Sequence, residues 1–214
     1  MAAIALVEPR LSGSGHRLVR NEKTKIYQMG DLMVAPSLSD SMLGYAYLRF
    51  EAEKLLPLIF HDGVPTLTWF LRRFQEAPEL GPVERVRTLG CYVGDALWGL
   101  GWTNAIAQIG QTPWRKGEVG MACFRKLHPE KALTFGQMML TWAFRELDLG
   151  VIYETTPVPN VSAVRFLKRL GFDFCGQLPR YSSWDGRLCD SWISAMTRDR
   201  WFSDLFPEGA DAAA

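Results

Sequence analysis

The segment from Thr134 to Pro179 reads TFGQMMLTWAFRELDLGVIYETTPVPNVSAVRFLKRLGFDFCGQLP, and it decides the fold. It opens with a strongly apolar stretch that predicts a helix from about residue 135 to residue 147. The β-branched stretch 151–155 follows and is typical of a short central strand. Asn160 then caps a second helix, and Gly171 marks its end. The segment therefore predicts a helix, a buried strand and a capped helix in immediate succession.

The sequence on either side of this segment adds further strands and helices to the prediction. Predicted strands lie within residues 25–35 and over 86–93, 96–109, 118–124, 180–184 and 187–196. Predicted helices run from Ser39 or Asp40 to about Leu56, before Pro57, and from Pro65 to a point before Pro78, and a loop is expected over 128–134. Gly94-Asp95 and Asp185-Gly186 supply hairpin turns. This order predicts an α/β fold, with a single mixed, mostly antiparallel sheet and helices on both faces.

Composition restricts the class of protein. Of the 214 residues, 48% are hydrophobic and 22% are charged, which is enough apolar surface for a folded core and excludes a disordered chain. The net charge of +1 gives no reason to expect nucleic acid as a partner, although a local basic patch stays open. No uncharged apolar run approaches the ~18 residues of a membrane span. The four cysteines form no CxxC pair, so we expect no metal site and a reducing, cytoplasmic location.

The expected domain organisation is simple. Residues 1–22 surround a Ser-Gly-Ser-Gly stretch and are predicted to form a flexible N-terminal arm. Residues 23–204 are predicted to form a single domain, best supported over 84–202, and residues 205–214 a flexible tail.

The pattern Asn160-x-x-Ala163-x-x-Phe166-Leu167-Lys168-Arg169-Leu170-Gly171-Phe172 resembles the second conserved motif of the GNAT superfamily of N-acetyltransferases. The aromatic-rich helix end at 142–147 and the terminal Asp-Gly hairpin look most like the branch that modifies ribosomal-protein N-termini. The resemblance covers residues 84–202 and implies a GNAT-like acyl-CoA N-acyltransferase fold.

The resemblance also implies where acetyl-CoA, the acyl donor, would bind. In such folds two neighbouring parallel strands splay apart, so the amides of strand 118–124 are free to bind the pantetheine arm and polarise the thioester carbonyl. Lys168 and Arg169 are candidates for the CoA 3′-phosphate, although cations at a helix C-terminus are favourable in any case. The implied cofactor-binding residues are Cys123, Phe124, Arg125, Lys131, Thr134, Phe135, Gly136, Asn160, Phe166 and Lys168.

The expected pyrophosphate loop, residues 125–136, is locally basic but departs from the family pattern. That pattern is Gln or Arg, two residues, Gly, one residue, then Gly or Ala. An alignment on the His-Pro pair at 128–129 and the Phe-Gly pair at 135–136, which we prefer, puts Lys131 and Thr134 at its first two positions. A second alignment puts Arg125, His128 and Glu130 at the three positions. Either leaves at most one glycine where the backbone must approach phosphate closely.

Acetyl transfer to an amine needs a base for the amine proton and an acid for the thiolate. Glu118, at the start of the strand beside the thioester, is the preferred base, and Glu154 and Asp190 are alternatives. Many family members carry a Tyr as general acid where this chain has Leu167, so Tyr181 is the candidate acid. Cys123 lies on the same strand as Glu118, where packing is the simpler role for a lone cysteine.

The resemblance implies an N-acetyltransferase that acts by direct attack of a primary amine in a ternary complex. Its acceptor would be an amine-bearing small molecule or a protein N-terminus, no membrane partner is expected, and a homodimer stays open. The glycine-poor loop and Leu167 keep an alternative open, a catalytically degenerate GNAT-fold binding or regulatory module.

Overall fold

A computed structural model describes residues 4–6, 18–36, 38–61, 63–74 and 86–205. Ten strands form one sheet in the order β1-β2-β3-β4-β5-β6-β7-β8-β10-β9. The strands are β1 (Ile4–Leu6), β2 (Val19–Asn21), β3 (Ile26–Met29), β4 (Leu32–Pro36), β5 (Arg87–Val93), β6 (Ala96–Gln108), β7 (Arg115–Cys123), β8 (Leu149–Pro157), β9 (Asp173–Trp184) and β10 (Arg187–Thr197). The helices are α1 (Asp40–Ala52), α2 (Leu56–Ile59), α3 (Leu67–Phe74), α4 (Pro129–Glu146), α5 (Val161–Arg169) and α6 (Arg198–Arg200), and a π-helical turn spans Trp201–Leu205.

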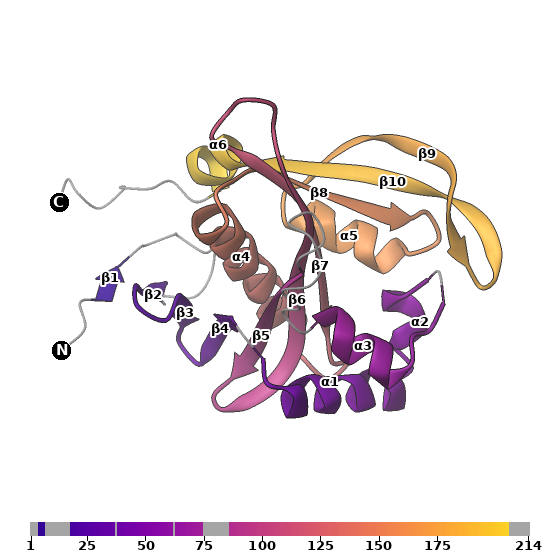
Figure 1. Ribbon diagram of the computed structural model, residues 1–214, viewed down its shortest axis with the longest axis horizontal. Helices are drawn as coiled ribbons and strands as arrows, with labels where there is room; N and C mark the ends of the chain where they lie inside the picture. Colours follow the sequence, from indigo (N-terminus) through magenta and orange to yellow (C-terminus); the bar gives the residue numbers. More distant parts are fainter. Residues whose placement is uncertain (1–3, 7–17, 37, 62, 75–85, 206–214) are drawn as a thin grey trace.

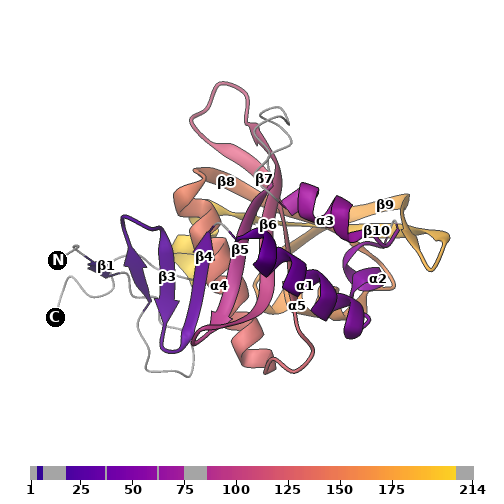
Figure 2. The ribbon, with the colours of Figure 1, turned by 60° about the horizontal axis from the view of Figure 1, so that its bottom comes forward.

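The sheet is mixed and mostly antiparallel, which confirms the predicted fold class. Only β7 and β8 pair in parallel among the described strands; every other neighbouring pair is antiparallel. Figure 1 shows the β9–β10 hairpin reaching away from the body, and Figure 2 shows the tip of the β6–β7 hairpin projecting beyond the helices. The parallel pair lies inside the sheet, with β6 on one side and β10 on the other, and α4 connects its two strands.

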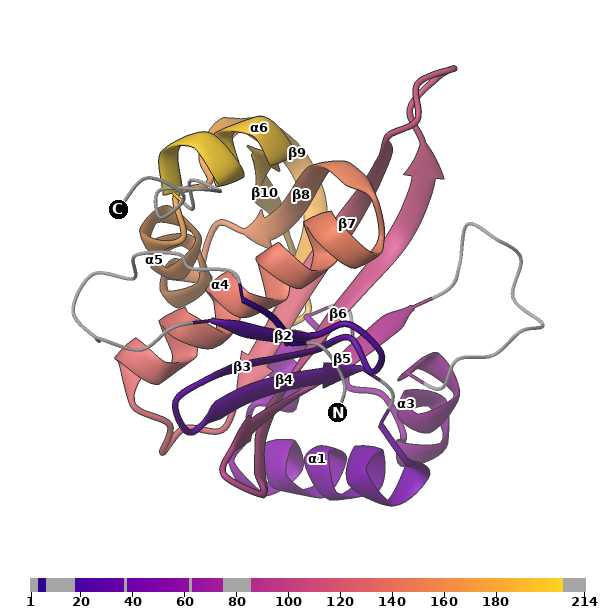
Figure 3. The same cartoon turned by 90° about the vertical axis from the view of Figure 1, so that its left-hand side faces the viewer.

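Helices cover both faces of the sheet. Figure 3 shows α4 and α5 on one side and α1 and α3 on the other. One buried cluster lies under α4 and α5 and includes Phe135, Phe144 and Ile152. A second lies under α1 and α3 and includes Phe50 and Phe70. Because successive side chains of a strand point to opposite faces, strands such as β4, β5 and β7 contribute to both cores.

The local signals around the central segment act as predicted. The Asn160 side-chain oxygen accepts a hydrogen bond from the Ala163 amide at 3.2 Å, which starts α5. At the other end Gly171 has a φ of 87°, and the Phe172 amide donates to the Leu167 carbonyl at 3.0 Å. The positive φ is the reason for glycine there. Ser39 caps α1 in the same way, with its hydroxyl accepting from the Met42 amide at 3.3 Å.

Several predicted boundaries were wrong. The single strand predicted within 25–35 is the β3–β4 hairpin, because Gly30 takes a φ of 59° and reverses the chain. Helix α1 ends at Ala52, so Pro57 does not stop it but lies in the first turn of α2. Helix α3 begins at Leu67 rather than at Pro65. Helix α4 begins at Pro129, six residues before the predicted start at 135, because His128 caps it and Pro129 fits its first position.

The predicted N-terminal arm contains strands β1 and β2. Strand β2 pairs with β3 and so extends the sheet. The predicted tail falls almost wholly on residues 206–214, outside the described residues. That the arm and the tail are flexible stays a prediction. None of the helices in the described ranges is both long and apolar enough to span a membrane.

A polar cluster joins the N-terminal strands to the end of α4. The Glu146 carboxylate accepts hydrogen bonds from Arg20 Nε at 2.7 Å and Tyr27 Oη at 2.8 Å, and Lys25 Nζ lies 3.4 Å away. Burial alone would raise the pKa of Glu146, but the Arg20 and Tyr27 hydrogen bonds outweigh it and lower the pKa below its ordinary 4.5. The ionised carboxylate therefore stabilises the folded state.

We expect Glu146→Gln to lower the free energy of unfolding by about 1.5–3 kcal/mol at pH 7, because hydrogen bonds to a charged group are lost. A lowered folded-state pKa contributes stability above about pH 4.5 and loses it as the pH falls through the folded value. The difference between the two proteins should therefore shrink below pH 4.5 in urea unfolding curves. A difference that stays constant from pH 7 to pH 3 would contradict this assignment.

Candidate active site

The parallel strands β7 and β8 are joined over only part of their length. Their register runs from Arg115 opposite Leu149 to Glu118 opposite Tyr153. Both strands are described throughout, and no pairing joins them beyond Glu118 and Tyr153. The facing main-chain groups of residues 119–123 and 154–157 therefore lack ladder partners, which is the gap expected for a thioester site.

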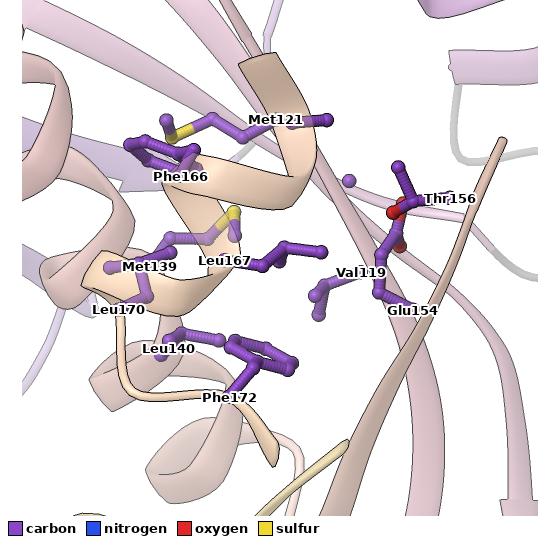
Figure 4. A pocket seen from close by; sticks show the side chains of 12 residues that line it. Val119, Met121, Met139, Leu140, Glu154, Thr156, Phe166, Leu167, Leu170 and Phe172 are labelled. Carbon is purple, nitrogen blue, oxygen red and sulfur yellow. The ribbon is translucent and has the colours of Figure 1, made fainter. Parts of the chain in front are cut away.

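A cavity of about 70 Å³ lies beside this gap, on the face that carries α4 and α5. Figure 4 shows Phe166 and Leu167 of α5 facing Glu154 and Thr156 of β8 across it. The lining residues are Val119, Gly120, Met121, Met139, Leu140, Glu154, Thr156, Ala163, Phe166, Leu167, Leu170 and Phe172. Apart from Glu154 and Thr156, this lining is apolar.

Two groups in the cavity call for an explanation. Burial, together with the nearby Glu118 carboxylate, raises the pKa of Glu154 well above its ordinary value of 4.5. Thr156 is only 2% exposed, and its hydroxyl has no hydrogen-bond partner. The hydroxyl of Ser194, which lies opposite Glu154 in the β8–β10 ladder, is also buried without a partner. Buried polar groups normally have partners, so this cluster is the kind that a ligand completes.

Glu118 points to the opposite face of the gap, where it is held by two neighbours. Asn104 Nδ2 donates to its Oε2 at 3.1 Å, and Thr155 Oγ1 donates to its Oε1 at 3.0 Å. The β6 strand bulges directly after Asn104, where Ala105 has a φ of 48°. Bulges re-aim side chains, and this one lies beside the Asn104 amide. The Asn104 Oδ1 atom is buried and without a partner, so it remains able to accept a hydrogen bond.

Tyr153 joins this second face. Burial raises the pKa of its hydroxyl, and the carboxylate of Glu118 and the nearby Tyr181 hydroxyl add to the rise. Tyr181 itself is 59% exposed on β9. The predicted acid Tyr181 is not among the residues that line the cavity containing Leu167. The alternative base Asp190 is committed elsewhere, because its carboxylate accepts from Gln177 Nε2 at 2.9 Å and from the Arg180 amide at 2.8 Å.

The end of β7 holds three predicted cofactor-binding residues. Burial raises the pKa of the Cys123 thiol to about 12, so Cys123 is a poor nucleophile at neutral pH. Phe124 is 1% exposed, packs against Phe50 of α1, and donates its amide to the Trp98 carbonyl at 2.9 Å. Arg125 is tied to α1, because its amide and its Nε donate to Glu53 at 2.6 Å and 2.8 Å. Phe124 and Arg125 thus have structural contacts and Cys123 packs against the core, and cofactor binding by these three residues stays a prediction.

The predicted pyrophosphate loop is largely helical. Lys131, Thr134, Phe135 and Gly136 all lie within α4, so the loop predicted over 128–134 was wrong, whereas the alignment of these residues with the family pattern stays a prediction. Residues 129–134 are helical because His128 caps the helix and Pro129 is well suited to its first turn. The second alignment instead puts its last two positions, His128 and Glu130, at the start of α4.

Several polar groups at the N-terminus of α4 already have partners within the protein. His128 Nδ1 accepts from the Glu130 amide at 3.3 Å, and Glu130 forms an ion pair with Arg169 at 2.8 Å. Lys131 Nζ lies 2.6 Å from Asp31. The Thr134 hydroxyl donates to the Glu130 carbonyl at 3.0 Å. A helix start still favours an anion, but the Glu130 carboxylate beside it repels one.

The remaining predicted residues lie along α4 and α5. Phe166 lines the cavity, whereas Lys168 lies over the Phe174 ring at 5.1 Å. Phe135 is fully buried in the core under α4. Gly136 lets the two helices meet, since a Cβ there would lie 3.0 Å from Phe166 Cζ and from Leu170 Cδ2. That close approach forms one wall of the cavity.

Asn104, Tyr153, Thr155 and Thr156 were missed by sequence reasoning. Thr155 and Thr156 directly follow Glu154, which was named as an alternative base. The alternation of side chains along a strand puts them on opposite faces, and this was the signal that could have identified them. No local signal indicated Asn104, because its position depends on the register between β6 and β7 and on the bulge beside it.

Solved structures that match this fold include acetyltransferases. The ribosomal-protein-S5-alanine acetyltransferase from Vibrio fischeri matches with a TM-score of 0.67 and 15% identity, over 82% of this chain and 98% of that chain. A spermidine N-acetyltransferase SpeG variant from Vibrio cholerae matches with a TM-score of 0.63 and 17% identity, over 80% and 96%. RimL, a ribosomal L7/L12 α-N-protein acetyltransferase in complex with coenzyme A, matches with 0.63 and 16%, over 78% and 94%. No protein-family model matches the sequence, and no curated protein does.

The chain therefore has the GNAT acyl-CoA N-acyltransferase fold, as the central segment predicted. The similarity in sequence to each of these structures is low, so it is the fold that they share with this chain.

Proposed function

We propose that this protein is an acyl-CoA-dependent N-acetyltransferase that transfers an acetyl group from acetyl-CoA to a primary amine. The observation that carries the proposal is the gap between β7 and β8, which has an apolar cavity on one face and a held carboxylate, Glu118, on the other. Donor and acceptor would thus approach the same gap from opposite faces. The fold and the activities of its structural neighbours support this proposal.

The residues of this chain fit a thioester-bearing arm. The unpaired edges of β7 and β8 supply main-chain donors and acceptors. The buried Thr156 hydroxyl has no hydrogen-bond partner, and a ligand can supply one. A free amide on β7 would stabilise the oxyanion that forms when the amine attacks the thioester carbonyl. Holding both reactants in one gap supplies the orientation that a direct transfer needs.

The face of the gap that carries Glu118, here called the acceptor face, suits an amine, and the face with the cavity is called the donor face. Glu118 is positioned to accept the proton that the amine loses, directly or through a water molecule. The Asn104 Oδ1 atom, which has no partner, is positioned to accept a second N–H of the same nitrogen. Two of the structural neighbours are named for modifying the N-terminus of ribosomal protein L7/L12 and another for acetylating spermidine, and both kinds of substrate carry primary amines. We therefore propose a protein N-terminus or a small amine as the acceptor.

A second candidate is a GNAT-fold binding or regulatory module that has lost catalysis. The N-terminus of α4 favours it, because no glycine stands among residues 125–135 and the Glu130 carboxylate lies at the helix start. Such a module would keep the sheet and the cavity but bind CoA weakly or not at all.

Thermal unfolding with acetyl-CoA and with free CoA separates the two candidates. Ligand at 100 times its Kd adds about 2.7 kcal/mol to the free energy of unfolding. For a chain of this size we expect a rise in Tm of about 5–11 °C. Dephospho-CoA is the matched control, because it lacks only the 3′-phosphate proposed for Lys168. An unchanged Tm at millimolar acetyl-CoA would contradict the enzyme proposal and favour the binding module.

A further inference from the structure

We propose that Glu154 is the proton donor to the thiolate that leaves acetyl-CoA, the role for which Leu167 has no acidic group. This inference rests on the proposed acetyl transfer, and it assigns a second catalytic carboxyl on the donor face. The geometry points to Glu154 because it is the only titratable side chain among the residues that line the described cavity. Figure 4 shows its carboxyl extending toward Thr156, opposite Leu167 of α5.

The surroundings of Glu154 favour its neutral, proton-bearing form. Burial is the main cause of its raised pKa, and the Glu118 carboxylate is the other. The facing residues Leu140 of α4, Leu167 of α5 and Ser194 of β10 carry no charge, so no cation among them offsets these effects. Two like charges on adjacent strands do not ionise together easily, and the buried carboxyl therefore keeps its proton.

The position of Glu154 in the fold separates it from Glu118. Adjacent residues of β8 face opposite sides of the sheet, so Thr155 reaches Glu118 while Glu154 and Thr156 face the cavity. One carboxyl thus lies on the acceptor face and one on the donor face of the same gap. Pairs of carboxyls whose environments differ in this way divide acid and base roles between them.

The reaction balances with these two groups. The amine nitrogen forms a bond to the thioester carbonyl carbon, and Glu118 takes the proton that the nitrogen releases. The C–S bond then breaks as the carbonyl re-forms, and the electron pair leaves on sulfur. Glu154 gives its proton to that sulfur, which yields CoA as a thiol and leaves Glu154 as a carboxylate. Afterwards Glu118 is protonated and Glu154 is ionised, so one proton must return from the first face to the second, through solvent, before the next turnover.

A proton donor is useful here because a thiol has a pKa of about 8.5 and departs more easily when it is protonated. The effect should be moderate, since a thiolate is a better leaving group than an alkoxide. The hydroxyl of Thr156, which is buried without a partner and lines the same cavity as Glu154, would complete its hydrogen bonding to the bound thioester arm.

The decisive variant is Glu154→Gln, which keeps the size of the side chain and removes its acidic proton. We expect kcat for thiol release to fall about a hundredfold, the lower end of general acid catalysis. The Kd for CoA should change less than threefold. In the natural protein kcat should fall on the alkaline side as Glu154 loses its proton, and this limb should be absent from the pH profile of Glu154→Gln. Glu51→Gln, on the exposed face of α1, is the matched control and should behave as the natural protein does.

A second donor tests the role itself. Phenyl thioacetate releases a more acidic thiol that needs no proton, so Glu154→Gln should act on it nearly as fast as the natural protein does. The same loss with both donors would overturn the proposal, because it would indicate a packing role. Full activity of Glu154→Gln with acetyl-CoA at every pH would also overturn it.

An infrared measurement is independent of turnover. The natural protein at neutral pH should show the C=O stretch of a protonated carboxylic acid, and Glu154→Gln should lack it. If Glu154→Gln does not fold, Glu154→Asp replaces it and should keep the alkaline limb of the pH profile. Failure of the natural protein to bind CoA or release thiol would instead overturn the proposed function, so the two failures are distinguishable.

Discussion

Glu118→Gln should lower kcat for thiol release by about 100-fold to 10,000-fold, the range of general base catalysis. The variant keeps an acceptor oxygen and the size of the side chain, so the contacts with Asn104 and Thr155 can largely persist. Binding of CoA should be unchanged because Glu118 faces away from the cavity. Thiol release measured at saturating acetyl-CoA and amine is the test, with CoA binding measured beside it.

Asp190→Asn is the matched comparison for this experiment. Asp190 was also named as an alternative base, but its carboxylate accepts hydrogen bonds from the Gln177 side chain and the Arg180 amide within the β9–β10 hairpin. We expect Asp190→Asn to keep kcat within a factor of about three. If Asp190→Asn is the slower of the two variants, the assignment of the base to Glu118 is wrong.

Trp201→Ala should have the largest effect on stability, a loss of about 3–5 kcal/mol in the free energy of unfolding. Trp201 is fully buried, packs against Phe144 of α4 at 6.2 Å between ring centroids, and donates its Nε1–H to Thr141 Oγ1 at 3.1 Å. Its removal leaves a cavity and removes the indole hydrogen bond to Thr141, whose hydroxyl still donates to the Gln137 carbonyl at 2.8 Å. Tm should fall by roughly 6–20 °C in a thermal melt.

Trp114→Ala is the control for Trp201→Ala. Trp114 is 40% exposed and lies under Arg198, whose guanidinium carbon is 4.9 Å from the centre of its ring. The same substitution at this exposed position should cost about 1 kcal/mol or less, mainly the cation–π contact. Equal losses at the two positions would show that burial of Trp201 is not what anchors the segment after β10 to α4.

Much of the fold could be predicted because its signals are local. The hairpin turn at Asp185-Gly186 has φ values of 49° and 73°, which these two residue types adopt more readily than others. The predictions failed at two prolines: Pro57 was predicted to end a helix and Pro129 to lie in a loop, whereas each lies in the first turn of a helix, a position that proline fits well. The candidate site was predicted less well than the fold. Glu118 was named as the base, but Asn104, Tyr153 and Thr156 were not recognised.

The sequence by itself determined the order of the elements, the caps at Asn160 and Gly171 and the alternation of apolar residues that makes a two-faced sheet. These features depend on residues that are at most a few positions apart. The tertiary structure alone decided where β7 and β8 separate, which face each carboxyl takes and that Glu118 and Glu154 lie close enough to influence each other. The physical reason is that strand register and helix packing bring together residues far apart in the chain. The ionisation of a buried carboxyl then depends on all the groups around it and not on its sequence neighbours.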